Sequence, residues 1–311
     1  MVYTLYLGTL IVLIAIILIL FKNKLQLKTT FFPAFLILLI VSFLCYMSIF
    51  FGITNPVIQL IASIWIYTVF ALIIIHSSIY LGNKKTLVFY VLSLLLGAIP
   101  ELIGVKYGWI FGHYYYNPAL TPFILGLVPV TTVISWAVVI YISYTLTNII
   151  LKFGARKPNF KSDSNIYVLI VIFGLSLISG YVAVNLDMLI DPVVVATQGW
   201  FWIGGGPYYG VPIGNFVGWF LIAFLATLIF RLFESVVETK NDLTSMESPL
   251  LDLSVISIYV MFFLIYGYSA LLLAHPEYLL IGSTAMGPFI VITVILTYIK
   301  YNRKVSLNGQ F

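Results

Sequence analysis

Residues 3–21 read YTLYLGTLIVLIAIILILF, a run without a single charge, and Lys22 and Lys24 follow it directly. A bilayer core about 30 Å thick requires roughly 20 apolar residues in one helix, so this run predicts a membrane-spanning helix. It is not typical of a signal peptide, because no basic residue precedes it and its apolar stretch is too long. We therefore expect the run to stay in the mature chain as the first span.

Eight further runs of similar character are bounded by charge, Gly or Pro. With the first run they predict nine spans, at residues 3–21, 31–51, 57–81, 86–103, 123–151, 166–186, 216–230, 255–273 and 278–299. Only 8% of the 311 residues are charged, whereas a soluble domain carries roughly 25%. The sequence thus predicts an all-α, polytopic helical bundle in the cell membrane, a single transmembrane domain over residues 1–311.

The basic residues predict the orientation of this bundle. Lys106 is the only Lys or Arg that follows an even-numbered span. The others follow odd-numbered spans: Lys22, Lys24, Lys28, Lys84, Lys85, Lys152, Arg156, Lys157, Lys161, Arg231, Lys240, Lys300, Arg303 and Lys304. The positive-inside rule then predicts the N-terminus outside and the C-terminus in the cytoplasm. We interpret the net charge of +5 as a determinant of membrane orientation and not as a sign of nucleic-acid binding. We interpret residues 231–252, with their mixed charges, as a solvated cytoplasmic loop.

Two connections on the predicted outer side are rich in aromatic residues, Gly and Pro. They read PELIGVKYGWIFGHYYYNPALTP at residues 100–122 and DMLIDPVVVATQGWFWIGGGPYYGVPIGN at residues 187–215. One interpretation is that Trp and Tyr lie at the bilayer interface and that Gly and Pro belong in loops. The other outer connections, at residues 52–56 and 274–277, show no such enrichment. The aromatic residues therefore indicate a site as well as an interface.

The two connections also resemble each other. In both, a carboxylate at the end of a span is followed in the same order by Gly-Trp, Tyr-Tyr, Val-Pro and a Trp in the next helix. The matching positions are 108–109 and 199–200, 115–116 and 208–209, 128–129 and 211–212, and Trp136 and Trp219. The spacings differ, so this is a weak internal repeat. A true duplication would make spans four to five and six to seven two related halves that face one cavity.

Three carboxylates lie where a bilayer disfavours them. Glu101 follows Pro100 in the fourth span, and Asp187 and Asp191 lie four residues apart at the end of the sixth. An ionisable group in a span costs free energy, about 2.5–3.5 kcal/mol for Asp at a helix centre, so such groups usually face a cavity or a partner. On a continuing helix the two Asp share a face, although Pro192 disfavours helix at Asp191. The alternative is that these residues pair with Lys106 or cap a helix.

Several chemistries lack the residues they require. Three scattered His cannot form the clusters that hold iron in membrane hydroxylases, and no ligand spacing supports a metal site. Residues 204–206, a run of three Gly, open no dinucleotide-binding unit. Asp187 and Asp191 have a DxxxD spacing that suits Mg²⁺ and diphosphate in a membrane prenyltransferase, but such enzymes use two acidic motifs on the cytoplasmic side. A channel would need polar residues through the depth of several helices, and these spans are apolar.

Carboxylic acids beside Tyr and Trp, with no cofactor motif, suit proton transfer to an apolar alkene. A carboxyl group desolvated at a membrane interface can stay protonated and act as a general acid. Protonation of the alkene gives a tertiary carbocation, which aromatic faces stabilise. Water attack, proton loss or ring closure then gives an alcohol, an isomer or a ring, and the residues alone leave these outcomes open.

The two connections carry a family resemblance. ELIGVKYGWIFGHYYYNP at residues 101–118, with GLVPV and Trp136 after it, and DPVVVATQGWFWIGGGPYYGVPIGNFVGW at residues 191–219 resemble the carotenoid biosynthesis membrane proteins. That family includes bisanhydrobacterioruberin hydratases and bacterial relatives acting on γ-carotene or lycopene ends. The resemblance covers residues 97–219, the motif-bearing core. It implies a hydro-lyase that adds water to terminal isoprenoid double bonds of a C50 or C40 polyene, without a cofactor.

From this resemblance and the acid chemistry together we expect specific roles. Glu101 or Asp191 would protonate the alkene, the other carboxylate would orient water, and Asp187 would lie in the same polar wall. The expected substrate-binding residues are Trp109, His113, Tyr115, Tyr116, Trp200, Trp202, Tyr208, Tyr209 and Asn215.

The expected partners follow from the same interpretation. They are a carotenoid or isoprenoid lipid that enters laterally from the bilayer, the membrane lipids, and other carotenoid-biosynthesis membrane enzymes, but no nucleic acid. The alternatives are a carotenoid cyclase, a prenyltransferase, or a non-catalytic lipid or carotenoid carrier, which would return its polyene chemically unchanged.

Overall fold

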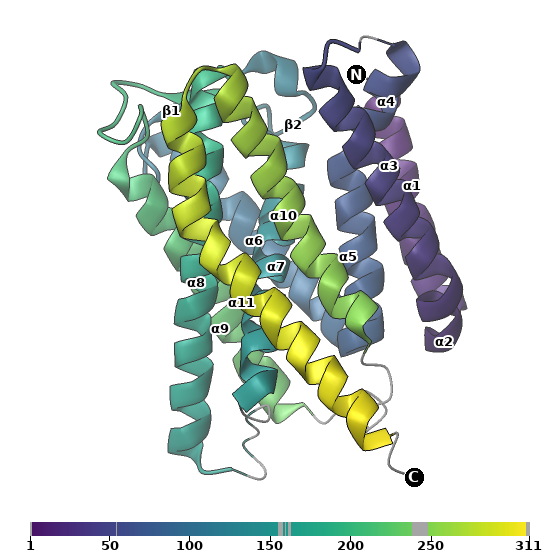
Figure 1. Cartoon of the computed structure of the whole chain (residues 1–311). Helices are drawn as coiled ribbons and strands as arrows, with labels where there is room; N and C mark the ends of the chain where they lie inside the picture. The colour runs from purple at the N-terminus through teal and green to yellow at the C-terminus, as the bar shows by residue number, and fades with distance from the viewer. Residues whose placement is uncertain are drawn as a thin grey trace. The chain divides into compact units, whose positions relative to one another are not determined.

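The protein is almost entirely helical (Figure 1). The structure, a computed structural model, describes residues 2–53, 55–154, 158, 160, 163–237 and 248–308. The helices are α1 (Val2–Phe21), α2 (Lys24–Gln26), the π-helical turn η1 (Leu27–Phe31), α3 (Phe32–Phe50), α4 (Pro56–Ser63), α5 (Trp65–Leu81), α6 (Asn83–Tyr107), the 3-10 turn η2 (Pro118–Leu120), α7 (Val130–Gly154), α8 (Asn165–Ala196), α9 (Ile213–Val236), α10 (Pro249–Leu272) and α11 (Pro276–Asn308). The prediction of an all-α fold is confirmed.

Four short strands lie in the connections: β1 (Tyr114–Tyr116), β2 (Phe123–Ile124), β3 (Val128–Pro129) and β4 (Trp200–Trp202). They form two separate pairs, β1 with β4 and β2 with β3. The second pair is antiparallel, with Phe123 opposite Pro129. The strands therefore shape the loops, while the helices make up the body of the protein.

Eight helices of the described residues are long and apolar enough to cross a membrane, and α4 with α5, bent by 41°, would make a ninth. Such helices satisfy every backbone hydrogen bond internally, as a bilayer demands. This agrees with the nine predicted spans and makes the chain a multi-pass membrane protein. Its orientation stays a prediction, and Arg156, Lys157, Lys161 and Lys240, on which that prediction partly rests, lie outside the described residues.

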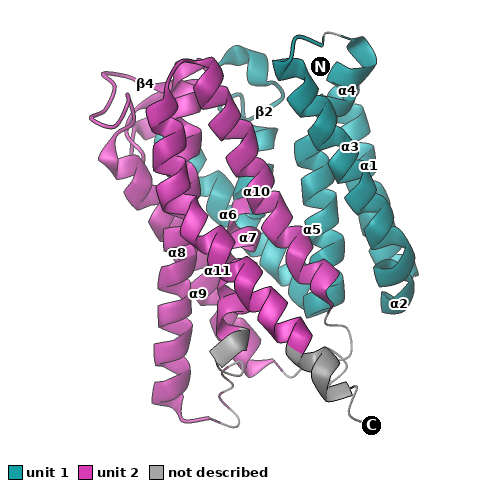
Figure 2. Ribbon diagram, in the orientation of Figure 1, with its two compact units in different colours: residues 1–106, 116–138 teal, residues 107–115, 139–311 magenta. Residues whose placement is uncertain are grey.

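The chain divides into two compact units, which Figure 2 colours separately. Unit 1 comprises residues 1–106 and 116–138, and unit 2 comprises residues 107–115 and 139–311. The single transmembrane domain and the motif-bearing core at residues 97–219 stay predictions.

In unit 1, α5 is the most buried helix, and only Tyr80 among its side chains is not fully buried. Helices α1 and α3 pack against it. A Cβ atom on Gly8 of α1 would lie 2.5 Å from the ring of Tyr67 in α5. Glycine at position 8 therefore lets the two helices approach closely, as small residues do in membrane helix pairs.

In unit 2, α8 packs against α9, α10 and α11 (Figure 1). Gly180 of α8 lies against Phe220 of α9, and Leu189 of α8 lies against Gly282 of α11. Glycine at each crossing brings the neighbouring helix close. The C-terminal half of α8 is consequently buried, and it carries Asp187 and Asp191.

Helix α8 is longer than the predicted span. We expected the span to end at Leu186 and Pro192 to disfavour helix at Asp191, but α8 continues to Ala196 and contains Pro192. A proline inside a helix removes one backbone donor, and neighbouring helices make this tolerable in a membrane protein. Asp187 and Asp191 therefore do lie on one continuous helix.

The fifth predicted span begins too early. Residues 123–129 form the β2–β3 pair instead of helix, and α7 begins at Val130. The turn between the strands uses positive φ angles at Leu125 (51°) and Gly126 (71°). Such angles are incompatible with a right-handed helix, which is why apolar composition alone misplaced this boundary.

Arg231, which we assigned to a solvated loop, is buried in α9. Its Nη1 donates to Oδ1 of Asn148, and its Nη2 donates to the carbonyl oxygen of Tyr144 at 3.3 Å. The guanidinium also lies 4.5 Å from the ring centroid of Tyr144. Because α9 extends to Val236, this charge lies against α7 instead of solvent.

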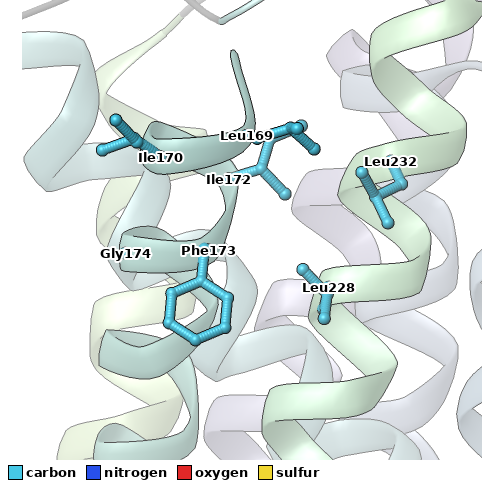
Figure 3. A pocket seen from close by; sticks show the side chains of 7 residues that line it. All are labelled: Leu169, Ile170, Ile172, Phe173, Gly174, Leu228 and Leu232. Carbon is cyan, nitrogen blue, oxygen red and sulfur yellow. The ribbon is translucent and has the colours of Figure 1, made fainter. Parts of the chain in front are cut away.

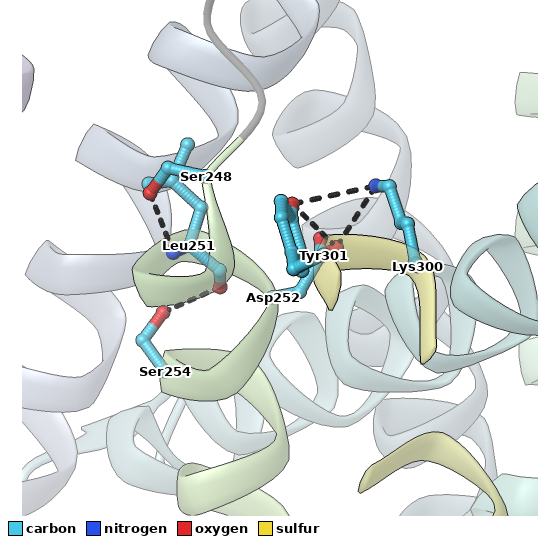
Figure 4. Close-up of polar contacts among 6 residues, drawn as sticks. All are labelled: Ser248, Leu251, Asp252, Ser254, Lys300 and Tyr301. Atoms are coloured by element: carbon cyan, nitrogen blue, oxygen red, sulfur yellow. Dashed lines mark hydrogen bonds and ion pairs between the residues drawn. The ribbon is translucent and has the colours of Figure 1, made fainter. Parts of the chain in front are cut away.

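Asp252, at the other end of the same predicted loop, is buried in α10. It accepts hydrogen bonds from Nζ of Lys300 at 3.2 Å and from the Tyr301 hydroxyl at 3.1 Å (Figure 4). Ser248 caps the start of α10 by accepting from the backbone N–H of Leu251. The solvated-loop prediction was therefore wrong at both ends of residues 231–252.

Candidate active site

Glu101 lies in α6 of unit 1 and is buried. Its Oε1 accepts a hydrogen bond from Nε1 of Trp136 at 2.7 Å, and its Oε2 accepts one from the Tyr116 hydroxyl at 2.6 Å. Hydrogen bonds to a buried carboxyl are among the stronger ones in proteins. Both oxygens of this carboxyl group are thus held by aromatic side chains.

Local packing explains how Trp136 reaches Glu101. Gly97 lies one turn before Glu101 on α6, and a Cβ atom on Gly97 would be 2.6 Å from Cβ of Trp136. Only glycine leaves room for the tryptophan there. Pro100, just before Glu101, lies within α6, and the helix continues to Tyr107.

Asp187 and Asp191 lie in unit 2 and are both buried. Asn215, the third residue of α9, donates from Nδ2 to Oδ2 of Asp187 at 2.8 Å and to Oδ2 of Asp191 at 2.5 Å. Nε1 of Trp200 donates to Oδ1 of Asp191 at 3.2 Å. Residues from α8, β4 and α9 therefore form one cluster, which we call the Asp pair site: Asp187, Asp191, Trp200 and Asn215.

Tyr208 lies beside the Asp pair site. Its hydroxyl donates to the carbonyl oxygen of Met188 at 2.9 Å. Burial raises the pKa of Tyr208, and the neighbouring Tyr209, Asp187 and Asp191 raise it further. The phenol consequently stays neutral over the physiological range of pH.

An aromatic series continues from Tyr208 through Tyr209 to Tyr278. The ring centroids of Tyr208 and Tyr209 are 5.1 Å apart, and those of Tyr209 and Tyr278 are 4.7 Å apart. Tyr209 has a positive φ of 50° and is followed by Gly210 at 88°, a tight turn that presents both tyrosines. Tyr278, at the start of α11, was missed in the sequence because its surroundings show no aromatic enrichment.

His275 and Glu277 adjoin Tyr278. The His275 ring stacks on Tyr278 with centroids 4.6 Å apart, and its Nδ1 lies 2.8 Å from Oε1 of Glu277. Within the part of the chain that the structure describes, no group of three or more His, Cys, Asp or Glu side chains could hold a metal ion.

Other predicted substrate-binding residues pack within the loops of unit 2. Trp202 is buried and donates from Nε1 to the carbonyl oxygen of Phe111 at 2.8 Å. The ring of Tyr115 contacts that of Phe201, with centroids 3.9 Å apart. Trp109 is 67% exposed, and the exposed His113 ring lies so close to Gly108 that a Cβ atom there would clash. Their roles in substrate binding stay predictions.

An apolar groove lies elsewhere in unit 2, between α8 and α9 (Figure 3). Its volume is about 610 Å³, and its lining residues are Leu169, Ile170, Ile172, Phe173, Gly174, Leu228 and Leu232. These residues belong to the first turns of α8 and the last turns of α9. None of the candidate carboxylates lines it, so the groove is not the candidate active site.

Residues 60–287 match a family model described as carotenoid biosynthesis protein. The chain belongs to the carotenoid biosynthesis protein family. The match includes Glu101, Asp187, Asp191 and the aromatic connections around them, so the predicted resemblance is confirmed.

A comparison with curated proteins shows similarity to the bisanhydrobacterioruberin hydratase of Haloarcula japonica. The two are 30% identical over 131 residues, which is 42% of this carotenoid biosynthesis family chain and 39% of the hydratase. The match thus spans well under half of either protein. No solved structure matches the chain.

Proposed function

We propose that this member of the carotenoid biosynthesis family is a carotenoid hydratase, a hydro-lyase that adds water to terminal isoprenoid C=C bonds. Its substrate would be a long polyene of the C50 bacterioruberin-precursor type or the C40 lycopene or γ-carotene type. The family match and the similarity to a hydratase support this proposal.

The observation that carries the proposal is the placement of acids. Glu101, Asp187 and Asp191 are buried in apolar helices, and each accepts hydrogen bonds from Trp, Tyr or Asn side chains. General acids at an alkene need this kind of desolvated, positioned carboxyl group. Glu101 and Asp191 are the two candidate proton donors.

The reaction balances without a redox partner. A carboxylic acid transfers its proton to the less substituted carbon of the terminal double bond. The π electrons form the new C–H bond, and a tertiary carbocation at the other alkene carbon and a carboxylate result. Tyr and Trp rings stabilise the cation through their quadrupoles. Water then forms the C–O bond and returns one proton to the carboxylate, so the product is the alkene plus one water.

The substrate would reach the acids from the lipid. A hydrocarbon polyene partitions into the bilayer core, and apolar helices exposed to lipid are the surface that it meets first. Membrane lipids and other carotenoid-biosynthesis enzymes are the proposed neighbours, and the proposed location is the cell membrane.

The test is expression of the chain in a lycopene-producing host, with product mass as the readout. A hydratase increases the polyene mass by one or two waters, whereas an unchanged mass would mean a carrier or a cyclase and would contradict the proposal. Chromatography and absorption distinguish the latter two. Asp191→Asn or Glu101→Gln is expected to slow hydration by about 10²–10⁴-fold if that residue is the general acid. Asp252→Asn, which alters a buried acid paired with Lys300, is the matched control and should retain the wild-type rate per folded protein.

A further inference from the structure

Asn215 has an unusual place in the Asp pair site. A single atom, its Nδ2, contacts one oxygen of Asp187 at 2.8 Å and one oxygen of Asp191 at 2.5 Å. Since both oxygens touch the same nitrogen, they lie no more than about 5.3 Å apart. All three side chains are buried, with 0%, 2% and 3% of their surfaces exposed for Asp187, Asp191 and Asn215.

The chemistry of an amide limits what this contact can do. The NH₂ group of Asn has two hydrogens, one for each carboxyl oxygen. It is neutral and cannot compensate two negative charges. Two ionised carboxylates this close, in surroundings of low dielectric constant, repel each other strongly, and such pairs commonly bind one proton between them.

The contacts of two neighbouring side chains differ from this bridge. Trp200 donates its single N–H to the second oxygen of Asp191, and Tyr208 donates its hydroxyl to the backbone of Met188. Tyr209 and Tyr278 are the further titratable groups close to Tyr208. Asn215 thus contacts both carboxyl groups at once and can hold them relative to each other.

We propose that Asn215 is a positioning residue that holds Asp187 and Asp191 as one acid pair with a single shared proton, and that this pair donates the proton to the alkene. The donor role rests on the proposed function, but the shared proton does not. Asp187 then has a role equal to that of Asp191. Asn215, expected from the sequence to bind substrate, acts instead through the acids.

The acid pair loses one proton and regains one proton in each reaction cycle. The protonated member gives its proton to the alkene and becomes a carboxylate, so the pair carries two negative charges only while the carbocation exists. The cation and the extra charge offset each other in that interval. Loss of a proton from the added water then restores the singly protonated pair.

Infrared spectroscopy of the full chain in lipid nanodiscs, at neutral pH and without substrate, tests the shared proton. We expect the C=O stretch of a protonated carboxylic acid, with the isotope shift in D₂O. The double variant Asp187→Asn/Asp191→Asn should lose the contribution of the pair to this band, as a wild-type-minus-variant difference spectrum shows. Asn215→Leu should shift it, because the bridging donor is lost while side-chain volume is kept. Asp252→Asn should leave it unchanged.

Three results would overturn the proposal: no protonated band in the wild type, a band of undiminished intensity in the double variant, or a band at the wild-type frequency in Asn215→Leu. Thermal melting of Asn215→Leu separates a shifted band from simple unfolding. If the band behaves as expected but the polyene gains no water, the hydratase proposal fails and the shared proton stands.

Discussion

Glu101 and Asp191 both accept a hydrogen bond from a tryptophan indole, but the two tryptophans are not equivalent in the chain. Trp136 follows Glu101 by 35 residues and lies in the next helix, whereas Trp200 follows Asp191 by nine and lies in β4. In the predicted repeat, Trp136 corresponds to Trp219. The tryptophans that donate to Glu101 and Asp191 are therefore not a pair that the repeat matches.

Replacement of Trp136 tests the support of Glu101. Trp136→Phe removes the N–H donor to Oε1 of Glu101 and should lower stability by about 1–3 kcal/mol, the usual cost of leaving a buried acceptor unsatisfied. Thermal melting in detergent measures it, with Trp109→Phe as the exposed control. Equal melting temperatures for the two variants would contradict this role of the indole.

The raised pKa of Tyr208 predicts that the stability of the folded protein falls at alkaline pH. Burial raises the pKa of Tyr208 above its ordinary value of 10.0, so the folded protein keeps the phenol neutral where the unfolded chain ionises it. The stability contributed by Tyr208 is fully present below about pH 10 and is lost as the pH rises above it. In Tyr208→Phe the loss of stability between about pH 8 and about pH 11 should be smaller than in the wild type. The same loss in both proteins, measured by thermal melting, would refute this assignment.

At the scale of elements, α8 organises unit 2. It brings Asp187 and Asp191 onto one face, and it packs closely on α9, which carries Asn215. The contact depends on Gly180, where a Cβ atom would lie 2.9 Å from both the ring and the carbonyl oxygen of Phe220. The geometry of the Asp pair site therefore depends on the close packing of α8 against α9 at Gly180.

Two glycines of α8 provide a matched test of this packing. Gly180→Ala forces α8 and α9 apart and should destabilise the protein by about 1–3 kcal/mol. Gly174→Ala has no heavy atom within 4 Å of the added Cβ and should be neutral or slightly stabilising, because alanine favours helix. Denaturant or thermal unfolding compares them, and a Gly174→Ala variant as unstable as Gly180→Ala would contradict the packing role.

At the scale of the whole molecule, the distribution of basic residues predicts orientation. Ile203 is 70% exposed in the loop after β4 and is expected outside, whereas Lys22, after α1, is expected in the cytoplasm. In a Cys45→Ser background, a membrane-impermeant thiol reagent applied to intact cells should label Ile203→Cys and not Lys22→Cys. The opposite labelling would reverse the predicted topology.

The sequence by itself determined the helices, the acids and the family. Long apolar runs suffice for the helices, because a bilayer leaves the backbone no other hydrogen-bond partners. Glu101, Asp187 and Asp191 were visible because charge is rare in this chain. The boundaries of the helices were less predictable. Pro192 lies inside α8, where the sequence predicted an end, and residues 123–129 form the β2–β3 pair, where the sequence predicted helix.

Only the tertiary structure decided which side chains meet. Asn215 lies 24 residues after Asp191, and its contact with both acids depends on how α9 packs against α8. The ring of Tyr278 contacts that of Tyr209, which lies nearly 70 residues earlier in the chain. Arg231 lies buried against α7 instead of in a loop. A long apolar run predicts that a helix forms. The rotation and distance of neighbouring helices arise from side-chain packing, which no local pattern of residues encodes.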